Sequence, residues 1–223
     1  MIKNIKIYGE RNSGTNLLQA ICSGSSFYHN AKTKAFDIPI VTRQFGWKHF
    51  FGFHDESIKK DGEETLFIGI VRNPYDWTMA LYNTKHHIPM PNRQMNGFLL
   101  NEWYSVELKP TSKTYGKEIM GDRNWHTGKR YKNIFELRKN KLLYLCETMP
   151  KIAKNYVFIR YEDLCLDVDK IMNNIKTKYN LKINDKYLRP KQKPPYKVPT
   201  SIKNIIDQNI DWEIELYARY TKR

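Results

Sequence analysis

Residues 9–16 read Gly-Glu-Arg-Asn-Ser-Gly-Thr-Asn, and their glycine spacing is that of a loop that binds phosphate. A short apolar run, residues 5–8, precedes them, and residues 17–21 are typical of the start of a helix. A glycine-rich turn between a strand and a helix directs backbone N–H groups and the positive end of the helix dipole at one point. The segment therefore predicts an anion site. A tight turn in which Asn12 or Ser13 caps the helix stays open as the alternative.

The same loop lacks two residues that ATP and GTP sites need. Those sites end in Gly-Lys-Ser/Thr, where the lysine reaches the β- and γ-phosphates and the hydroxyl holds Mg²⁺. Thr15 stands in place of the lysine, and Asn16 stands in place of the hydroxyl residue. The loop is suited to an anion and poorly equipped for metal-assisted triphosphate chemistry.

A guanidinium follows a second buried run. Residues 66–71 read as a strand and lead into Arg72, which could grip a phosphate at two points. Pro74 is typical of a first helical position. A structural ion pair of Arg72 with Asp76 or Glu162 is the alternative.

An aromatic residue follows a third run, residues 156–160. Tyr161 could lie against a base or a ribose, while Glu162 and Asp163 could cap the next helix. Taken alone, this short segment favours the structural interpretation.

Three short strands separated by longer helical segments, such as residues 134–149, predict an α/β fold. We expect a three-layer, P-loop-like domain with a central parallel β-sheet flanked by helices. Ligands of such sheets bind beyond the carboxyl ends of the strands, where the three motifs lie.

The length predicts a single domain over residues 1–223. Residues 86–130 have weak periodicity, which predicts a long surface excursion or a lid over a site. Residues 189–197 form a basic loop stiffened by proline, and residues 201–220 read as a closing helix with a possible break.

The composition points to an anionic partner, because 38 Lys and Arg against 23 Asp and Glu give a net charge of +15. A basic surface that merely maintains solubility is the alternative. Cys22, Cys146 and Cys165 show no metal-ligand spacing, which predicts reduced core thiols and no metal. No leader and no apolar run of about 20 residues is visible, so we expect a cytoplasmic protein without a membrane partner.

Together the motifs resemble, in chain order, three signature segments of the sulfotransferases that use 3′-phosphoadenosine 5′-phosphosulfate (PAPS). The matching segments are residues 11–16, 72–76 and 161–164, and residues 212–217 are similar to the closing helix of that family. The resemblance implies PAPS as donor and adenosine 3′,5′-bisphosphate (PAP) as product, with no metal, since PAPS has no γ-phosphate. It implies that the first segment holds the 5′-phosphosulfate, that Arg72 grips the 3′-phosphate and that Tyr161 lies near the adenine. The residues of the first segment are Arg11, Asn12, Ser13, Gly14, Thr15 and Asn16.

The chain departs from the family pattern and resembles a divergent branch. Arg11 stands where the family commonly has lysine, Leu17 where it often has an aromatic residue, and Ala80 where a serine helps to bind the 3′-phosphate. Thr78 or the basic loop at residues 189–197 could compensate for Ala80. The Arg-Lys-Gly segment of the cytosolic members has no clean match.

The resemblance implies a base and a cation between the first two motifs, and Lys48 and His49 fit those roles. We assign His49 as general base, with Lys48 and Arg11 stabilising the charge that develops on sulfonate and phosphate. If this segment were a strand, neighbouring side chains would point to opposite faces, whereas a bulge or loop removes that objection. The alternative bases are His54, His86, His87, His126, Asp55 and Glu10.

The predicted activity is transfer of a sulfuryl group to a hydroxyl or amine of a small-molecule or glycan acceptor. A sugar or aromatic ring of the acceptor could stack on Trp103, Tyr104, Trp125 or His126. The alternatives are a P-loop small-molecule kinase and a non-catalytic basic protein that binds a nucleotide or nucleic acid. A nucleic-acid partner is disfavoured, because no helix-turn-helix or RNP-like segment is visible.

Overall fold

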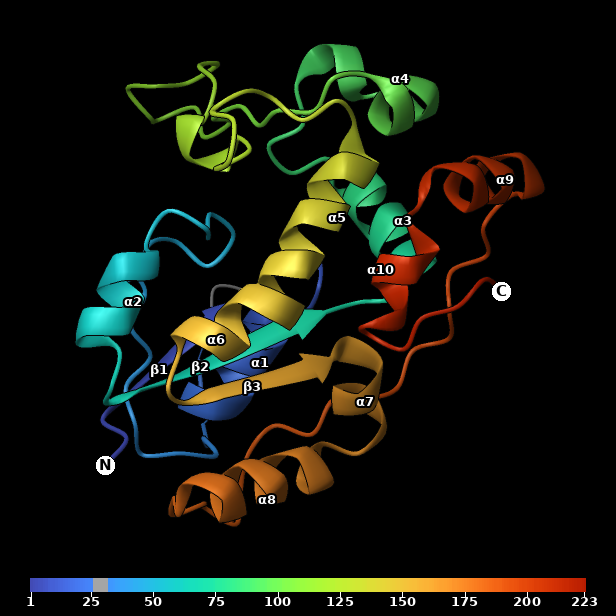
Figure 1. The fold of residues 1–223 in the computed structure, drawn as a ribbon. Coiled ribbons are helices and arrows are strands. Elements are labelled where there is room, and N and C mark those ends of the chain that lie inside the picture. The colour runs from blue at the N-terminus through green and yellow to red at the C-terminus, as the bar shows by residue number, and fades with distance from the viewer. Residues whose placement is uncertain (26–31) are drawn as a thin grey trace. The chain divides into compact units, whose positions relative to one another are not determined.

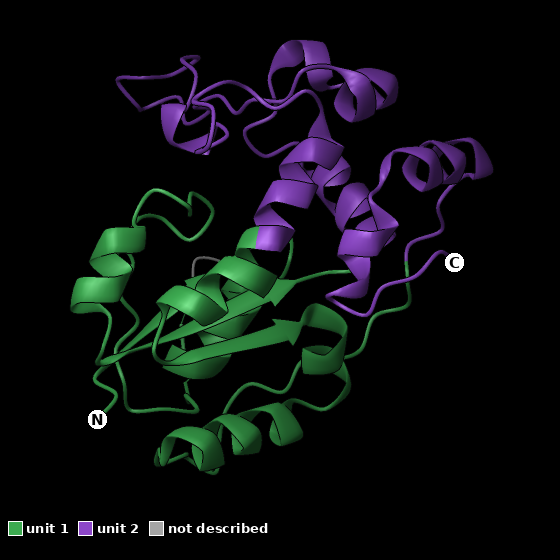
Figure 2. Ribbon diagram, viewed as in Figure 1, with its two compact units in different colours: residues 1–73, 144–195 green, residues 74–143, 196–223 purple. Residues whose placement is uncertain are grey.

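The computed structural model describes residues 1–25 and 32–223. The chain divides into two compact units (Figure 2), of which the first comprises Met1–Asn73 and Tyr144–Pro195. The second comprises Pro74–Leu143 and Tyr196–Arg223. That the units act as one domain, with a lid within residues 86–130, stays a prediction.

The first unit holds a three-stranded parallel sheet in the order β1 (Asn4–Tyr8), β2 (Thr65–Val71) and β3 (Tyr156–Arg160) (Figure 1). All three predicted strands are confirmed. β2 lies in the centre and is buried along its whole length, as its continuous apolar sequence requires. The register pairs Tyr8 with Gly69 and Val71 with Arg160, so the strands end near one edge of the sheet.

Helices and loops cover both faces of this sheet. On one face, Ile7, Ile68 and Ile159 belong to a core that includes Leu18 and Met172. On the other face the packing is aromatic: the Tyr8 ring centroid lies 6.1 Å from that of Phe67 and 5.4 Å from that of Phe51. The helices of this unit are α1 (Thr15–Ser23), α2 (Asp55–Asp61), α6 (Met149–Ile152), α7 (Tyr161–Leu166) and α8 (Val168–Tyr179), and a π-helical stretch (Tyr144–Thr148) leads into α6. The three-layer α/β architecture is therefore confirmed.

The second unit is mainly helical, and its core contains Trp77, Phe98, Trp103, Tyr131 and Ile206. The helix predicted to start at Pro74 is confirmed, and the closing helix is confirmed with its break. Its elements are α3 (Pro74–Thr84), α4 (Met95–Leu100), α5 (Ile134–Leu143), α9 (Thr200–Asn209) and α10 (Trp212–Leu216), with short 3-10 turns at Met90–Asn92 and Met120–Asp122.

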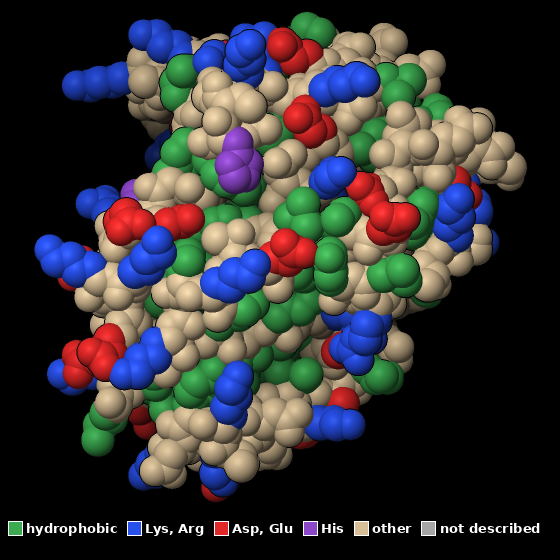
Figure 3. Space-filling model, in the orientation of Figure 1, with side chains coloured by type: hydrophobic (Ala, Val, Ile, Leu, Met, Phe, Trp, Pro, Cys, Tyr) green, Lys and Arg blue, Asp and Glu red, His purple; other side chains and the backbone are tan. Residues whose placement is uncertain are grey.

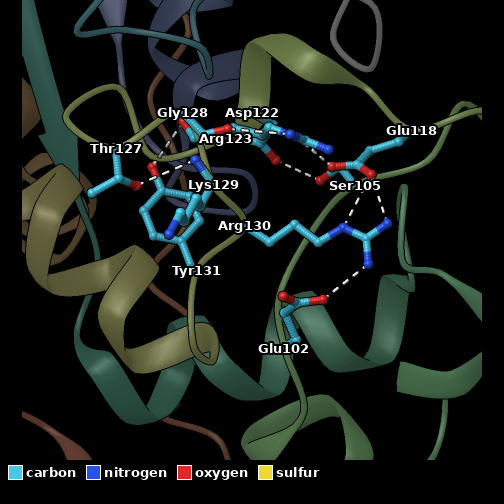
Figure 4. A network of polar contacts seen from close by, with 10 residues as sticks. All are labelled: Glu102, Ser105, Glu118, Asp122, Arg123, Thr127, Gly128, Lys129, Arg130 and Tyr131. Carbon is cyan, nitrogen blue, oxygen red and sulfur yellow. Dashed lines mark hydrogen bonds and ion pairs between the residues drawn. The ribbon is translucent and has the colours of Figure 1, made fainter.

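Ion pairs organise the long segment between α4 and α5 (Figure 4). The Glu118 carboxylate accepts from Arg123 at 2.8 Å and from Arg130 at 2.7 and 3.0 Å. Arg130 also donates to Glu102 at 2.9 Å, and its guanidinium lies 3.7 Å from the centroid of the Tyr104 ring. This segment is ordered by its charges, where regular secondary structure is sparse.

Candidate active site

The glycine loop that follows β1 is a tight turn seated on β2. A Cβ added at Gly9 would lie 2.5 Å from the Ile70 carbonyl oxygen, so only glycine fits there. The Ser13 N–H and hydroxyl both donate to the Glu10 carbonyl, at 3.1 and 2.5 Å. Gly14 adopts φ 102°, a backbone conformation that favours glycine. The sequence thus builds the loop from close backbone packing.

The loop delivers the chain into the N-terminus of α1. Gly14 caps this nine-residue helix without a side-chain hydrogen bond, and the first turn carries no acidic residue. The N–H groups of a first helical turn have no intrahelical acceptor and carry the positive end of the dipole. This arrangement can receive an anion.

Arg72 and Tyr161 come from the ends of β2 and β3 and meet at this loop. Arg72 Nη1 donates to the Asn12 carbonyl at 3.3 Å, and its guanidinium lies 4.5 Å from the centroid of the Tyr161 ring. A Cβ at Gly14 would lie 2.5 Å from Cδ2 of Tyr161. Burial raises the pKa of the Tyr161 hydroxyl to about 12. Three segments far apart in the sequence therefore form one cluster.

Each of the two carboxylates predicted as alternative partners of Arg72 also contacts another group. Glu162 accepts from the Asn73 N–H at 2.8 Å. Asp76 forms an ion pair with Arg223 at the C-terminus of the chain. Arg72 itself contacts a carbonyl and an aromatic ring, and an ion pair with one of these carboxylates stays an alternative.

Lys48 and His49 lie in a loop and not in a strand, so their side chains need not point to opposite faces. Phe45 and Gly46 have φ values of 61° and 80°, which turn the backbone sharply before them. His49 is 6% exposed, and its Nδ1 lies 2.6 Å from the Gly9 carbonyl oxygen. A carbonyl only accepts, so Nδ1 carries the hydrogen and the basic lone pair is on Nε2.

The Lys48 ammonium donates to the amide oxygen of Asn16, in the first turn of α1. Burial lowers the pKa of Lys48 to about 8. The backbone joins the two loops as well, because the Gly9 N–H donates to the Lys48 carbonyl at 3.0 Å. The structure therefore brings Lys48 and His49 to the glycine loop.

Arg11 lies inside the protein behind the loop. It is 1% exposed, and its guanidinium carbon lies 5.8 and 5.3 Å from the ring centroids of Trp47 and Phe50. Nη1 lies 3.6 Å from Oε1 of Glu10. In this position Arg11 would act on a bound anion through its field rather than through solvent-exposed contact. That it grips the anion stays a prediction.

Four of the six alternative bases make structural contacts. Asp55 accepts from the Tyr144 hydroxyl at 2.7 Å, and Oε1 of Glu10 accepts from the Arg11 N–H at 2.7 Å. His54 packs so closely on Gly46 that a Cβ there would lie 2.4 Å from its ring. Nδ1 of His87 lies 2.7 Å from the Val106 carbonyl oxygen.

Thr78 and the basic loop at residues 189–197, which were expected to compensate for Ala80, have different surroundings. Thr78 is fully buried, and its hydroxyl donates to the Pro74 carbonyl at 2.7 Å within α3. In the basic loop, Lys193 is exposed and its charge reaches α7. Burial raises the pKa of the Cys165 thiol, and the Tyr161 hydroxyl, Arg72 and Lys193 oppose that rise. Lys193 is therefore near the Arg72–Tyr161 cluster.

Two features escaped sequence reasoning. Residues 39–41 run beside β1, where Ile5 donates to the Pro39 carbonyl and accepts from the Val41 N–H, both at 2.9 Å. The apolar run at residues 38–41 was the signal that could have revealed this pairing. The second feature is a cavity of about 180 Å³ at this edge of the sheet. Its polar lining residues are Lys6, Asn16, Gln19, Thr42 and Lys48.

The four residues predicted to stack on a ring of the acceptor differ in their burial. Trp103 is 1% exposed and Tyr104 lies against the Arg130 guanidinium, so neither ring is presented to an acceptor in this structure. Trp125 is half-buried and His126 is exposed. On the face drawn in Figure 3, Lys and Arg side chains are scattered among Asp and Glu.

Over residues 1–25 and 32–223, no three His, Cys, Asp or Glu side chains are grouped so that they could hold a metal ion. Within the same part of the chain, no helix is both long enough and apolar enough to cross a bilayer.

Comparisons with known proteins give likenesses among solved structures alone. No protein-family profile matches the chain, and a search of curated proteins finds no match. Among solved structures, the chain is similar to mouse sulfotransferase SULT7A1 complexed with PAP, at 12% sequence identity and a TM-score of 0.44. The likeness covers 98% of this chain and 89% of that one. A likeness of this size does not carry activity or substrate across.

Proposed function

We propose that this protein transfers a sulfuryl group from PAPS to a hydroxyl or amine of an acceptor. The observation that carries the proposal is the cluster at the carboxyl edge of the sheet. There, an anion loop without the lysine and hydroxyl of a triphosphate site meets Arg72 and Tyr161. A donor with two separate phosphate groups and no γ-phosphate matches that combination.

In this proposal the turn at residues 11–16 and the N-terminus of α1 bind the 5′-phosphosulfate. Arg72 binds the 3′-phosphate, and Tyr161 lies near the adenine. Lys193 adds positive charge on the Arg72 side, which would compensate in part for Ala80. The residues present therefore fit PAPS, and none of these roles requires a metal ion.

Transfer forms a bond from the acceptor oxygen or nitrogen to sulfur and breaks the bond from sulfur to the bridging phosphate oxygen. His49 takes the acceptor proton at Nε2, the nitrogen that the Gly9 contact makes basic. Lys48 and the field of Arg11 stabilise the negative charge on the departing phosphate, and PAP is the product.

The acceptor and the cellular setting belong to the same proposal. We propose a small molecule or a glycan as acceptor, with the half-buried Trp125 and the exposed His126 as the ring candidates, and a cytoplasmic enzyme without a membrane partner.

A thermal-shift comparison tests the donor. Ligands that bind the native state raise the unfolding temperature by mass action. PAP should raise it without metal, whereas ATP with Mg²⁺ should change it little. A shift with ATP and Mg²⁺ and none with PAP would defeat the proposal and favour a kinase.

A His49→Ala variant tests the base once an acceptor is in hand. General-base catalysis typically contributes about 10²- to 10⁴-fold, so turnover should fall by that factor while PAP binding stays. Full turnover by the variant would end the assignment.

A further inference from the structure

The Lys6 ammonium, on β1, is enclosed by backbone oxygens. The side chain is 1% exposed, yet Nζ donates to the carbonyls of Thr42 at 3.1 Å, Gln44 at 2.7 Å and Gly46. Three alternate residues of one loop thus turn their oxygens toward a single nitrogen. Backbone carbonyls arranged in this way replace the hydration shell of a monovalent cation.

No carboxylate forms an ion pair with Lys6 in the described residues, and the Tyr8 ring centroid lies 5.5 Å from its Nζ. Burial lowers the pKa of Lys6 to about 8, so the amine is still mainly protonated at neutral pH. The three carbonyls need that charge, because buried acceptors left without a donor are costly.

Two groups at the end of β1 and just after it form hydrogen bonds to later residues of the same loop. The Tyr8 hydroxyl donates to the Phe45 carbonyl, and the Gly9 N–H donates to that of Lys48. Phe45 adopts φ 61°, which persists only where the surroundings hold it. The loop from Thr42 to His49 is therefore attached to one strand by a series of its carbonyls.

We propose that Lys6 is a positioning residue: its ammonium takes the place of a bound monovalent cation, organises the carbonyls of residues 42–46 and thereby places Lys48 and His49 at the phosphate loop. The catalytic use of that placement rests on the proposed function, whereas the organisation of the loop does not. Lys6 also lines the 180 Å³ cavity, so a small molecule has room to approach the space that a truncated side chain would leave.

The experiment compares Lys6→Ala with the wild type by trypsin cleavage after Arg43, which is exposed within the loop. Cleavage after Lys113, exposed in the second unit, is the internal reference. Release of the loop should raise Arg43 cleavage about tenfold or more, since proteolysis follows local opening. The matched control is Lys3→Ala, which removes a lysine that pairs with Glu64 at the surface.

Chemical rescue separates the charge from the packing. n-Propylammonium replaces the atoms that Lys6→Ala removes, and it should return Arg43 cleavage to near the wild-type rate. n-Propanol has a similar volume without the charge and should not. Unchanged cleavage in the variant, or equal rescue by both compounds, would overturn the proposal.

If Lys6→Ala does not fold, the wild type decides. With ¹⁵N-labelled lysine, the Lys6 side chain should give a slowly exchanging ammonium signal at neutral pH, and a neutral amine would refute the role. Neither readout uses a nucleotide, so a failure here is distinct from a failure of PAP to bind.

Discussion

Positively charged side chains of the two units have different kinds of partner. In the second unit, Arg138 forms a two-point pair with Glu215, and Lys141 pairs with Asp122 at 2.7 Å. In the first unit, Lys6 is held by carbonyls and Lys48 by an amide oxygen, and Arg72 contacts a carbonyl and a ring. Arg11 is intermediate, since Glu10 lies 3.6 Å away.

This difference predicts which cations stabilise the fold and which contribute to ligand binding. A carboxylate cancels the field of its partner, so such a pair organises a core but attracts no ligand. A carbonyl or ring holds a cation through partial charges and leaves a net positive charge, which an anionic ligand can use. The first unit should therefore lose ligand affinity, and the second should lose stability, when their cations are removed.

The largest effect is expected for Arg138→Met. The side chains of Arg138 and Glu215 are 7% and 3% exposed, so the variant leaves an uncompensated buried carboxylate. Breaking such a pair costs about 3–5 kcal/mol, to be measured by urea unfolding. Lys139→Met is the matched control, because the side chains of its pair with Asp211 are 46% and 32% exposed and the pair should matter by less than about 1 kcal/mol. PAP affinity of folded Arg138→Met should match the wild type. A large affinity loss would contradict the prediction that the cations of the second unit contribute to stability and not to ligand binding.

Arg72→Met should show the opposite pattern. Loss of a charge-assisted contact to phosphate costs about 1.5–3 kcal/mol, which corresponds to roughly a 10- to 100-fold weaker affinity for PAP by calorimetry. Stability should change by less than about 1 kcal/mol, because the Arg72 side chain is only half-buried. Arg189→Met, which removes an exposed pair with Asp169, is the control. Unfolding of Arg72→Met with unchanged PAP affinity would assign Arg72 a structural role.

The first unit also shows how far local sequence patterns predict the structure. All three strands, and the meeting of Arg72, Tyr161 and the glycine loop, follow from local patterns, because parallel strands bring their carboxyl ends to one edge. Burial of Arg11 and the enclosure of Lys6 could not be predicted in this way. Both depend on where the loop after residue 41 folds back, and no local pattern specifies that path.

The titration of Lys48 predicts that PAP affinity depends on pH. Its pKa is lowered to about 8, so the ammonium is charged at pH 7 and mainly neutral at pH 9. PAP affinity should therefore fall as pH rises through 8, by about three- to tenfold between those values. Lys48→Met should bind more weakly at pH 7 and lose most of this dependence. An identical pH profile in the variant would place the titrating group elsewhere, with Lys6 as the first candidate.

The smallest effect is expected for Lys193→Met, in the exposed basic loop. Lys193 acts on α7 through solvent, where screening limits what one charge contributes. PAP affinity should fall about two- to threefold at low salt and hardly at all at high salt. Lys191→Met is the matched control. Lys191 is exposed in the same loop, but the charge that acts on the pKa of the Cys165 thiol from this loop is that of Lys193. Equal losses in both variants would mean that the loop attracts PAP only by its total charge. A loss confined to Lys193 would support a position of that residue beside the 3′-phosphate.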